Sequence, residues 1–415
     1  MRRTGLLGAV ATLAVVINGC SSGDDGLAAT TASSPITSEA TDTTVAVETT
    51  TVADEPLEPT EAPTVFPGSD WATADPADHG LDAAGLEAAR EYAFRPGFNT
   101  QGVVVIRGGE IVAEWYAEEK SADSWAASWS VAKSFTSAVT GIAISDGAIS
   151  SVDTSAADYI SEWAGTDRAS ITIKDLLQMN SGLDWDEDYR GGDAEIVRMA
   201  TGELNQLAFS ASIPLIAEPG TRWSYASGDS MLLGGIVEAA TGRSMDEYAT
   251  EKLLEPIGLD QIEWWRDAVG NTLGYCCVDS TSRDFARLGL LYLHNGNWDG
   301  VQVVPEQWVR DTITPVENSN GEYGYQWWTY DIDGVPADTF LAEGIDGQFI
   351  YVIPSLDLVV VRNGLYAKDP GPPIAEPSLF ARYPSGSLVP GRGTEAEGDW
   401  NSSEFLGPII DAVQD

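Results

Sequence analysis

The fold expected for this chain is decided by the stretch Trp125-Ala126-Ala127-Ser128-Trp129-Ser130-Val131-Ala132-Lys133. It places a serine hydroxyl and a lysine amine three residues apart, where a strongly helical sequence begins. Apolar residues then follow at three- and four-residue steps as far as Gly147: Phe135, Ala138, Val139 and Ile142. This spacing predicts a buried helix that Ser130 opens, with the side chains of Ser130 and Lys133 on one face.

A serine and a lysine in this arrangement suit nucleophilic catalysis. A serine hydroxyl is a poor nucleophile at neutral pH unless a nearby base accepts its proton. Lysine is such a base only when uncharged, and both burial and a helix N-terminus disfavour the ammonium form. The same helix end offers a backbone N–H to a developing oxyanion. The alternative is an ordinary helix with an exposed lysine, and the motif alone does not exclude it.

A second candidate element lies on a loop bounded by Gly and Pro, residues 218–229. The loop leads into an apolar helix predicted from Met231 to Ala240. Tyr225 and Ser227 are therefore expected at the mouth of the loop. A phenol beside a lysine can relay protons between a nucleophile and a leaving group. The alternative is a tyrosine whose ring packs under the loop.

Strand signals flank this helical region on both sides. Residues 102–106 and 111–116 form a predicted hairpin, residues 339–354 two strands joined by a Gly-rich turn, and residues 358–362 a third strand. Glycines in strands let a substrate or another backbone approach closely, although they can also be purely structural. We expect one antiparallel sheet closed by N- and C-terminal strands, with a mainly helical insert, which is an α+β fold.

The N-terminal region has the features of an export signal. Met1-Arg2-Arg3 and an apolar run over residues 6–17 precede Cys20, and Gly19-Cys20 looks like a bacterial lipobox. The expected mature protein is lipid-anchored through Cys20 to the outer face of the bacterial cell membrane. An ordinary cleaved signal, giving a secreted protein, is the alternative. Residues 1–19 are then the signal, 20–70 an acidic Thr/Ser/Pro tether that does not fold, and 71–415 the enzyme domain.

Composition limits the partners that this chain can have. Its formal net charge of −42 argues against nucleic acid and anionic lipid headgroups, since both are polyanions and would be repelled. Membrane contact is therefore expected only through the lipid anchor. The length of 415 residues and the 43% hydrophobic content are those of a globular enzyme.

The cysteine and histidine content gives no sign of a metal site. Only His79 and His294 are present, and neither lies in a cluster with ligand spacing. No metal or organic cofactor is therefore expected. Apart from Cys20, the chain has only the adjacent Cys276 and Cys277. We expect these to be two buried free thiols, with a vicinal disulfide as the alternative.

The three motifs, in this order and spacing, resemble the serine β-lactamase and penicillin-binding protein superfamily, especially its class C β-lactamase-like and esterase branch. The supporting stretches are residues 172–177, 256–259 and 283–289. Residues 181–189 and the turn at 344–348 look most like 6-aminohexanoate-dimer hydrolases. The resemblance implies a β-lactamase/transpeptidase-like fold, in which an antiparallel sheet is flanked by helices and joined by a mainly helical subdomain.

The resemblance also implies a role for each motif residue. Ser130 is the nucleophile that forms an acyl-enzyme, Lys133 activates it, and Tyr225 carries the proton to the leaving group. Ser227 stands where the family more commonly has Asn, and would contact Lys133 or the substrate. The backbone N–H groups of Ser130 and Gln348 would form the oxyanion hole.

The resemblance implies substrate contacts for Tyr189, Asp346, Gly347 and Gln348. The last motif departs from the β-lactamase pattern, because Ile345 stands where Lys or His usually helps to hold a substrate carboxylate. Strong binding of β-lactams or stem peptides is therefore not expected unless a residue such as Arg362 substitutes.

The sequence thus predicts an exported serine hydrolase that acts on a small ester, amide or short oligomer. One alternative is a β-lactamase or D,D-peptidase. Another is an inactive module that binds wall fragments or a partner, which the intact Ser130, Lys133 and Tyr225 argue against.

Overall fold

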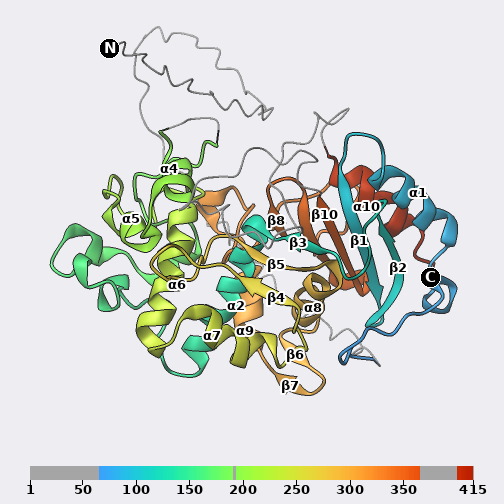
Figure 1. Ribbon diagram of the computed structural model, residues 1–415, viewed down its shortest axis with the longest axis horizontal. Helices are drawn as coiled ribbons and strands as arrows, with labels where there is room; N and C mark the ends of the chain where they lie inside the picture. The colour runs from blue at the N-terminus through green and yellow to red at the C-terminus, as the bar shows by residue number, and fades with distance from the viewer. Residues whose placement is uncertain (1–64, 190–192, 365–399, 415) are drawn as a thin grey trace, which may run out of the picture. The chain divides into compact units, whose positions relative to one another are not determined.

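Five strands form an antiparallel sheet in the order β2-β1-β10-β9-β8 (Figure 1). The computed structural model describes residues 65–189, 193–364 and 400–414. The strands are β1 (Thr100–Arg107), β2 (Glu110–Tyr116), β8 (Phe340–Gly344), β9 (Gln348–Ile353) and β10 (Leu358–Gly364). β1 pairs with β10 from Thr100–Gly364 to Arg107–Leu358, so the sheet is closed by an N-terminal and a C-terminal strand, as predicted.

Alternating side chains of the sheet build two separate cores. Val103 and Val105 face one core, and Val104 and Ile106 face the other, because successive side chains of a strand point to opposite faces. On the first face α1 (Ala83–Ala93) packs against α10 (Ser402–Asp411), and on the second face α8 (Ser282–Leu293) covers β9 and β10 (Figure 1). Helices therefore flank the sheet on both faces.

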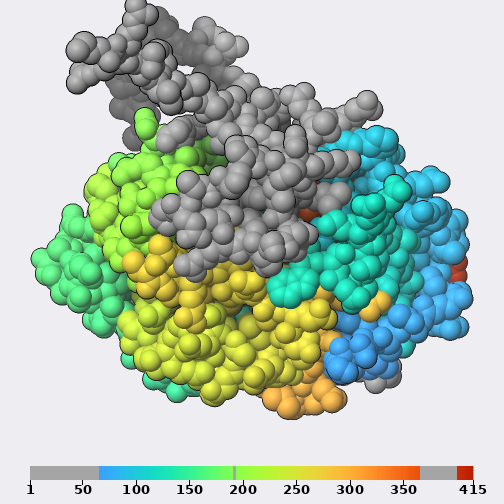
Figure 2. Space-filling view, viewed as in Figure 1, coloured from blue at the N-terminus to red at the C-terminus, as the bar shows by residue number. Residues whose placement is uncertain are grey.

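The larger core continues into a mainly helical part between β2 and β8. Its helices are α2 (Ala132–Ser145), α3 (Ile173–Leu177), α4 (Glu195–Gly202), α5 (Gln206–Ser212), α6 (Ser227–Thr241), α7 (Met245–Ala249) and α9 (Glu306–Thr312). On the face shown in Figure 2 this part, coloured green to yellow, lies beside the blue and teal segments that lead into the sheet. α2 packs against α6, which brings the Ser130 motif to the loop before α6.

Two short sheets lie outside the five-stranded sheet, and one of them leads into the Ser130 motif. β3 (Trp125–Ala127), β5 (Val278–Thr281) and β4 (Ile262–Trp264) form one, in the order β3-β5-β4, and β6 (Asn297–Trp298) pairs with β7 (Val301–Gln302). β3 ends directly before Ser128. The pairing of β3 with β5 therefore fixes the position of the residues that lead into Ser128 and the motif.

The described chain begins at residue 65, a few residues before the predicted start of the enzyme domain at 71. Pro67 and Gly68 are held against the domain, because the buried guanidinium of Arg287 donates hydrogen bonds to their carbonyls. The predicted signal, Cys20 and most of the predicted tether lie outside the described residues. None of the described helices combines the length and the apolar character that crossing a membrane requires.

Candidate active site

Ser130 lies in a short 3-10 turn, Trp129–Val131, and α2 begins two residues later at Ala132. The sequence placed Ser130 at the first position of the α-helix itself. The difference arises at Trp129, whose φ of 44° is a left-handed conformation that a tryptophan adopts only at a cost. This turn leaves Ser130 partly exposed, while the following residues of α2 are buried.

The amine of Lys133 is buried, at 1% exposure, and makes three polar contacts. Its Nζ lies 3.0 Å from Ser130 Oγ, 3.0 Å from Ser227 Oγ and 3.0 Å from the carbonyl oxygen of Tyr275. Burial lowers the pKa of Lys133 to about 8, although the negative charge of Glu187 opposes that shift. A substantial fraction of Lys133 is therefore neutral near pH 8, in contact with the serine hydroxyl.

Tyr225 lies against the same amine. Its ring centroid is 4.9 Å from Lys133 Nζ, and its ring stacks on that of Trp328 at 5.5 Å. Burial and the charge of Glu187 raise the pKa of Tyr225 far above its usual range, against the effect of a hydrogen bond with Ser130. The phenol therefore keeps its proton at neutral pH and can donate it.

Ser227 is the first residue of α6, four residues earlier than the predicted start of that helix at Met231. The first N–H groups of a helix have no partner within the helix. Here the Ser227 N–H donates to Glu187 Oε2 at 3.0 Å, and its hydroxyl donates to Glu187 Oε1 at 2.6 Å. A carboxylate from a distant segment thus anchors the helix end that carries Ser227.

Glu187 is the functional residue that the sequence analysis missed. It also accepts hydrogen bonds from Trp185 Nε1 at 2.5 Å and from the hydroxyl of Tyr189 at 2.8 Å. Tyr189 thereby joins the site through Glu187. The available signal was the spacing, because positions 185, 187 and 189 share one side of an extended segment.

The turn between β8 and β9 approaches the nucleophile through Gly344. A methyl group on Gly344 would lie 2.4 Å from the carbonyl oxygen of Ser128 and 3.1 Å from the amide nitrogen of Ser130. It would also lie 3.2 Å from Cβ of Gln348. Only glycine permits this approach, which brings the end of β8 against the backbone of Ser128 and Ser130.

The turn between β8 and β9 carries three of the predicted substrate-contact residues, Asp346, Gly347 and Gln348. The Gln348 side chain is buried, and its Oε1 accepts from Asn363 Nδ2 at 3.0 Å. Asp346 is exposed. Gly347 has a φ of 76°, and its carbonyl accepts from Arg362 at 2.6 Å. The Gln348 side chain therefore faces its strand neighbour Asn363, and the Gly347 carbonyl is engaged by Arg362.

Arg362 is buried behind the turn between β8 and β9. Its guanidinium is 2% exposed and donates to the carbonyls of Asp346, Gly347 and Phe98. It also lies 4.4 Å from the ring of Trp400. These contacts engage Arg362 in supporting the turn.

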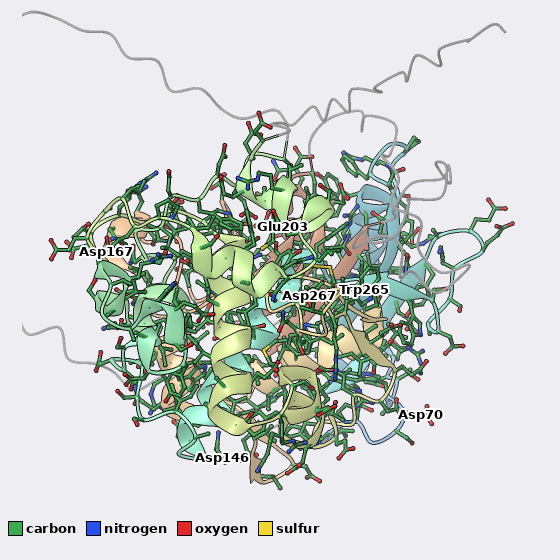
Figure 3. All side chains as sticks on the ribbon, turned by 60° about the vertical axis from the view of Figure 1, so that its left-hand side comes forward. Asp70, Asp146, Asp167, Glu203, Trp265 and Asp267 are labelled. Atoms are coloured by element: carbon green, nitrogen blue, oxygen red, sulfur yellow. A yellow bond between two sulfur atoms is a disulfide. The ribbon has the colours of Figure 1, made fainter. Side chains whose placement is uncertain are left out.

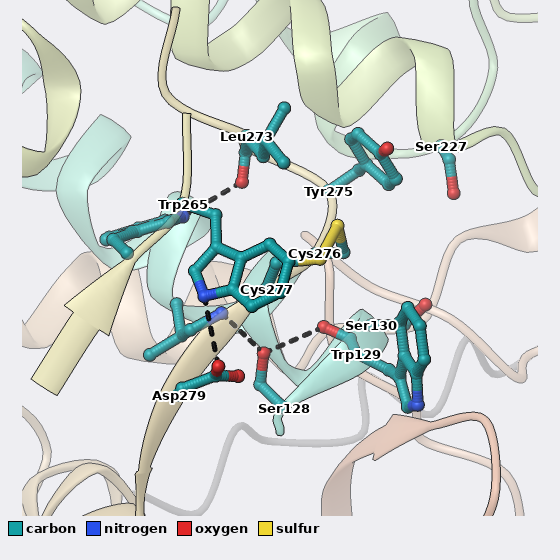
Figure 4. Close-up of a disulfide and its surroundings, with 12 residues drawn as sticks. Ser128, Trp129, Ser130, Ser227, Trp265, Leu273, Tyr275, Cys276, Cys277 and Asp279 are labelled. Carbon is teal, nitrogen blue, oxygen red and sulfur yellow. Dashed lines mark hydrogen bonds between the residues drawn. A yellow bond between two sulfur atoms is a disulfide. The ribbon is translucent and has the colours of Figure 1, made fainter. Parts of the chain in front are cut away.

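Cys276 and Cys277 form a disulfide with each other, which corrects the expectation of two free thiols. Both are buried, as expected. The pair lies between Tyr275, whose carbonyl accepts from Lys133, and Val278, whose N–H donates to Ser128 Oγ at 2.8 Å (Figure 4). Sequence adjacency gave no preference for the bonded form, because the choice depends on how the surrounding backbone is held.

Among residues 65–189, 193–364 and 400–414, no three His, Cys, Asp or Glu side chains gather as a metal ion would require. What the site contains is a partly exposed hydroxyl, a buried amine, a protonated phenol and a carboxylate. This set can move one proton from the hydroxyl to the amine and deliver one from the phenol.

Comparison with known proteins places this geometry in a family context. The Beta-lactamase family model matches residues 87–373. The 6-aminohexanoate-dimer hydrolase of Paenarthrobacter ureafaciens is 26% identical over 287 residues, covering 63% of this chain and 72% of that protein. Penicillin-binding protein 4 of Amycolatopsis lactamdurans is 27% identical over 288 residues, covering 58% and 73%.

The fold is also shared with solved structures. The octameric penicillin-binding protein homologue from Pyrococcus abyssi superimposes with a TM-score of 0.53 and 20% sequence identity. The match covers 67% of this chain and 71% of that chain. At this identity the similarity shows the fold alone.

Proposed function

The chain belongs to the beta-lactamase family of serine hydrolases, and from this premise we propose that it is an exported hydrolase that cleaves an ester or amide bond through an acyl-serine intermediate. The observation that carries the proposal is the contact between Ser130 Oγ and Lys133 Nζ at 3.0 Å, with an amine whose pKa is lowered to about 8. A hydroxyl in contact with a partly neutral amine is an activated nucleophile.

The reaction proceeds in two halves. Neutral Lys133 accepts the Ser130 proton as Oγ attacks the substrate carbonyl, and the oxyanion forms near the amides of Ser130 and Gln348. Tyr225 donates its proton to the leaving alcohol or amine, and the proton on Lys133 restores the phenol. Water then attacks the acyl-serine with the same groups acting in reverse, which releases the acid and regenerates Ser130.

An ester or amide without a critical carboxylate fits this site better than a β-lactam or a stem peptide. The last motif has Ile345 in place of a cation, and Arg362 is engaged in the turn. The acidic side chains beside the site, Glu187 and Glu343, would repel a substrate carboxylate. The hydrolase relative of Paenarthrobacter ureafaciens supports an amide as one substrate type.

A labelling experiment tests the proposal against both alternatives. The purified protein is incubated with a fluorophosphonate probe and, separately, with a labelled penicillin, beside its Ser130→Ala variant. We expect fluorophosphonate labelling that is lost in the variant. A stable or turned-over penicillin adduct would instead indicate a β-lactamase or D,D-peptidase, and no labelling by either reagent would indicate a binding module. A panel of p-nitrophenyl esters and short amides then compares the two substrate classes.

We further propose that the enzyme is held at the outer face of the bacterial cell membrane by a lipid on Cys20, with no nucleic-acid partner. The lipobox-like Gly19-Cys20 and the apolar run before it support the anchor, and the net charge of −42 supports the exclusion of polyanions. Cell fractionation of the Cys20→Ser variant tests the anchor, because an anchored protein should leave the membrane fraction when Cys20 is replaced.

A further inference from the structure

Glu187 accepts four hydrogen bonds, two at each carboxylate oxygen. Oε1 accepts from the hydroxyls of Ser227 and Tyr189, and Oε2 accepts from the Ser227 N–H and the indole of Trp185. An ionised carboxylate has about four lone-pair positions and no proton to donate. All four positions of Glu187 are occupied, so the charged form is the one that this environment fits.

The contacts of Ser227 determine where the protons of Lys133 point. The only proton on Ser227 Oγ is donated to Glu187 at 2.6 Å, so the same oxygen must accept from Lys133 at 3.0 Å. The carbonyl of Tyr275 can also only accept. A neutral amine has two N–H groups and one lone pair. The two N–H groups are assigned to Ser227 and Tyr275, and the lone pair is left for Ser130.

We propose that Glu187 is a positioning residue of this enzyme: by holding the hydroxyl proton of Ser227, it makes the neutral Lys133 direct its lone pair at Ser130. The inference rests on the proposed acyl-serine reaction. Glu187 acts through Ser227, whose N–H and hydroxyl both donate to its carboxylate, and its charge raises the pKa of Lys133. It selects one of the proton arrangements that Lys133 and Ser227 could otherwise adopt.

A glutamine at position 187 would disturb this arrangement while keeping the size of the side chain. The amide has one oxygen, but the Ser227 N–H and hydroxyl both need an acceptor. If the oxygen accepts from the N–H, the amide NH₂ faces Ser227 Oγ and donates to it. The hydroxyl proton then turns towards Lys133 and competes with Ser130 for the lone pair.

The charge of Glu187 has a second, separable effect on Lys133. It opposes the lowering of the Lys133 pKa by burial, so removing it should move the pKa of Lys133 further down. The other titratable groups near the pair are phenols and buried acids, and burial raises the pKa of each: Tyr189, Tyr225, Tyr275, Tyr323, Asp229 and Glu343. Burial is the larger influence on the pKa of Lys133, and the charge of Glu187 is the one that opposes it.

A double-mutant cycle distinguishes this role from simple support of the α6 end. The rate of fluorophosphonate labelling is measured against pH for the wild type, Glu187→Gln, Ser227→Ala and the double variant. In this labelling Ser130 Oγ bonds to phosphorus, fluoride leaves, and Lys133 takes the hydroxyl proton. The label is assigned to Ser130 because the Ser130→Ala variant does not acquire it. Thermal unfolding of each variant reports whether the fold is retained.

At high pH, where Lys133 is neutral, we expect Glu187→Gln to label at least about 10-fold more slowly than the wild type. In the Ser227→Ala background, Glu187→Gln should lower the labelling rate by less than about 3-fold. The limb of the profile that reports Lys133 should lie at lower pH in both proteins that carry glutamine. Glu343→Gln changes another acidic side chain beside the site, one that accepts from the hydroxyl of Tyr330, so its effect should add to that of Ser227→Ala.

Two results would overturn the inference. If the fold-losses in labelling rate caused by Glu187→Gln and by Ser227→Ala multiply in the double variant, Glu187 does not act through Ser227. If Glu187→Gln labels at the wild-type rate at high pH, where Lys133 is neutral, Glu187 does not direct the lone pair of Lys133. An unshifted pH profile would contradict only the separate effect of the Glu187 charge on the pKa of Lys133. If the wild-type protein is not labelled at all, the proposed acyl-serine reaction itself is wrong. This outcome is distinct from the other two, because it is seen in the wild type before any variant is compared.

Discussion

The titration of Lys133 should govern the pH dependence of the enzyme. Only the neutral amine can accept the Ser130 proton, and burial lowers the pKa of Lys133 to about 8. Protonation below that value removes the base, so kcat/KM for an ester should rise with pH and level off above about 8. Lys133→Ala should lose at least about 10³ in kcat/KM and should also lose this limb.

A steady-state pH profile with a p-nitrophenyl ester measures both effects. Lys174→Ala is the matched control, because Lys174 is an exposed lysine on α3 outside the site and its removal should leave the profile unchanged. Near-normal turnover in Lys133→Ala would rule out lysine as the base.

The residues of the site differ in how far the sequence identifies them. Ser130 and Lys133 were predicted together because a helix fixes the geometry between two positions three apart. Glu187 was not predicted, because its role depends on meeting Ser227, forty positions further along the chain. The acidic run around Glu187 resembles an ordinary solvated segment, and its aromatic neighbours at alternate positions were the only sign of burial.

At the scale of elements, the approach of β8 to the Ser130 turn should be sensitive to a single methyl group. Gly344→Ala would put Cβ 2.4 Å from the carbonyl oxygen of Ser128, so the strand and the turn must separate. A misplacement of about 1 Å in such a site costs on the order of 10² in rate. We expect a loss of that size in kcat/KM, with little change in the melting temperature because β8 is an edge strand.

Gly407→Ala serves as the control for this substitution. Gly407 lies in α10, and a Cβ there would meet no atom within 4 Å, so the rate should stay at the wild-type value. Wild-type kcat/KM in Gly344→Ala would show that the close approach has no part in catalysis.

The regular elements followed from local patterns, whereas the irregular ones did not. The strands around Val104 and Val360 and the buried helix after Lys133 were predicted from periodicity, since a strand or helix repeats its pattern over several residues. The 3-10 turn at Trp129 and the disulfide of Cys276 and Cys277 have no repeat. They are imposed by the packing of β3, β5 and the β8–β9 turn around them.

At the scale of the whole molecule, the negative charge is carried largely at the periphery, while a few carboxyl groups are buried. Asp70, Asp146 and Asp167 are exposed, and Figure 3 shows them at the outer edge of the molecule. Mutual repulsion of such charges opposes the folded state and weakens in salt. Buried acids respond to pH in a different way, because burial favours the protonated form of a carboxyl group.

Asp279, on β5, is the clearest of these buried acids. It is 1% exposed, and Trp265 Nε1 donates to its Oδ2 at 3.0 Å (Figure 4). Its Oδ1 has no hydrogen-bond partner among the residues that the structure describes. Burial raises the pKa of Asp279 to about 8, and the charge of Glu263 adds to the shift. The folded protein therefore binds a proton here that the unfolded chain releases.

The free energy of unfolding should consequently fall as pH rises from about 4, the usual pKa of an aspartate in an unfolded chain, to about 8. Asp279 contributes a slope of up to about 1.4 kcal/mol per pH unit within that window. Asp279→Asn keeps a neutral group of similar shape, so it should flatten the slope and leave the protein relatively more stable at the upper end. Denaturant unfolding at several pH values measures this, with Asp70→Asn as the exposed control that keeps the wild-type slope. An unchanged slope in Asp279→Asn would mean that this carboxyl is already ionised in the folded protein.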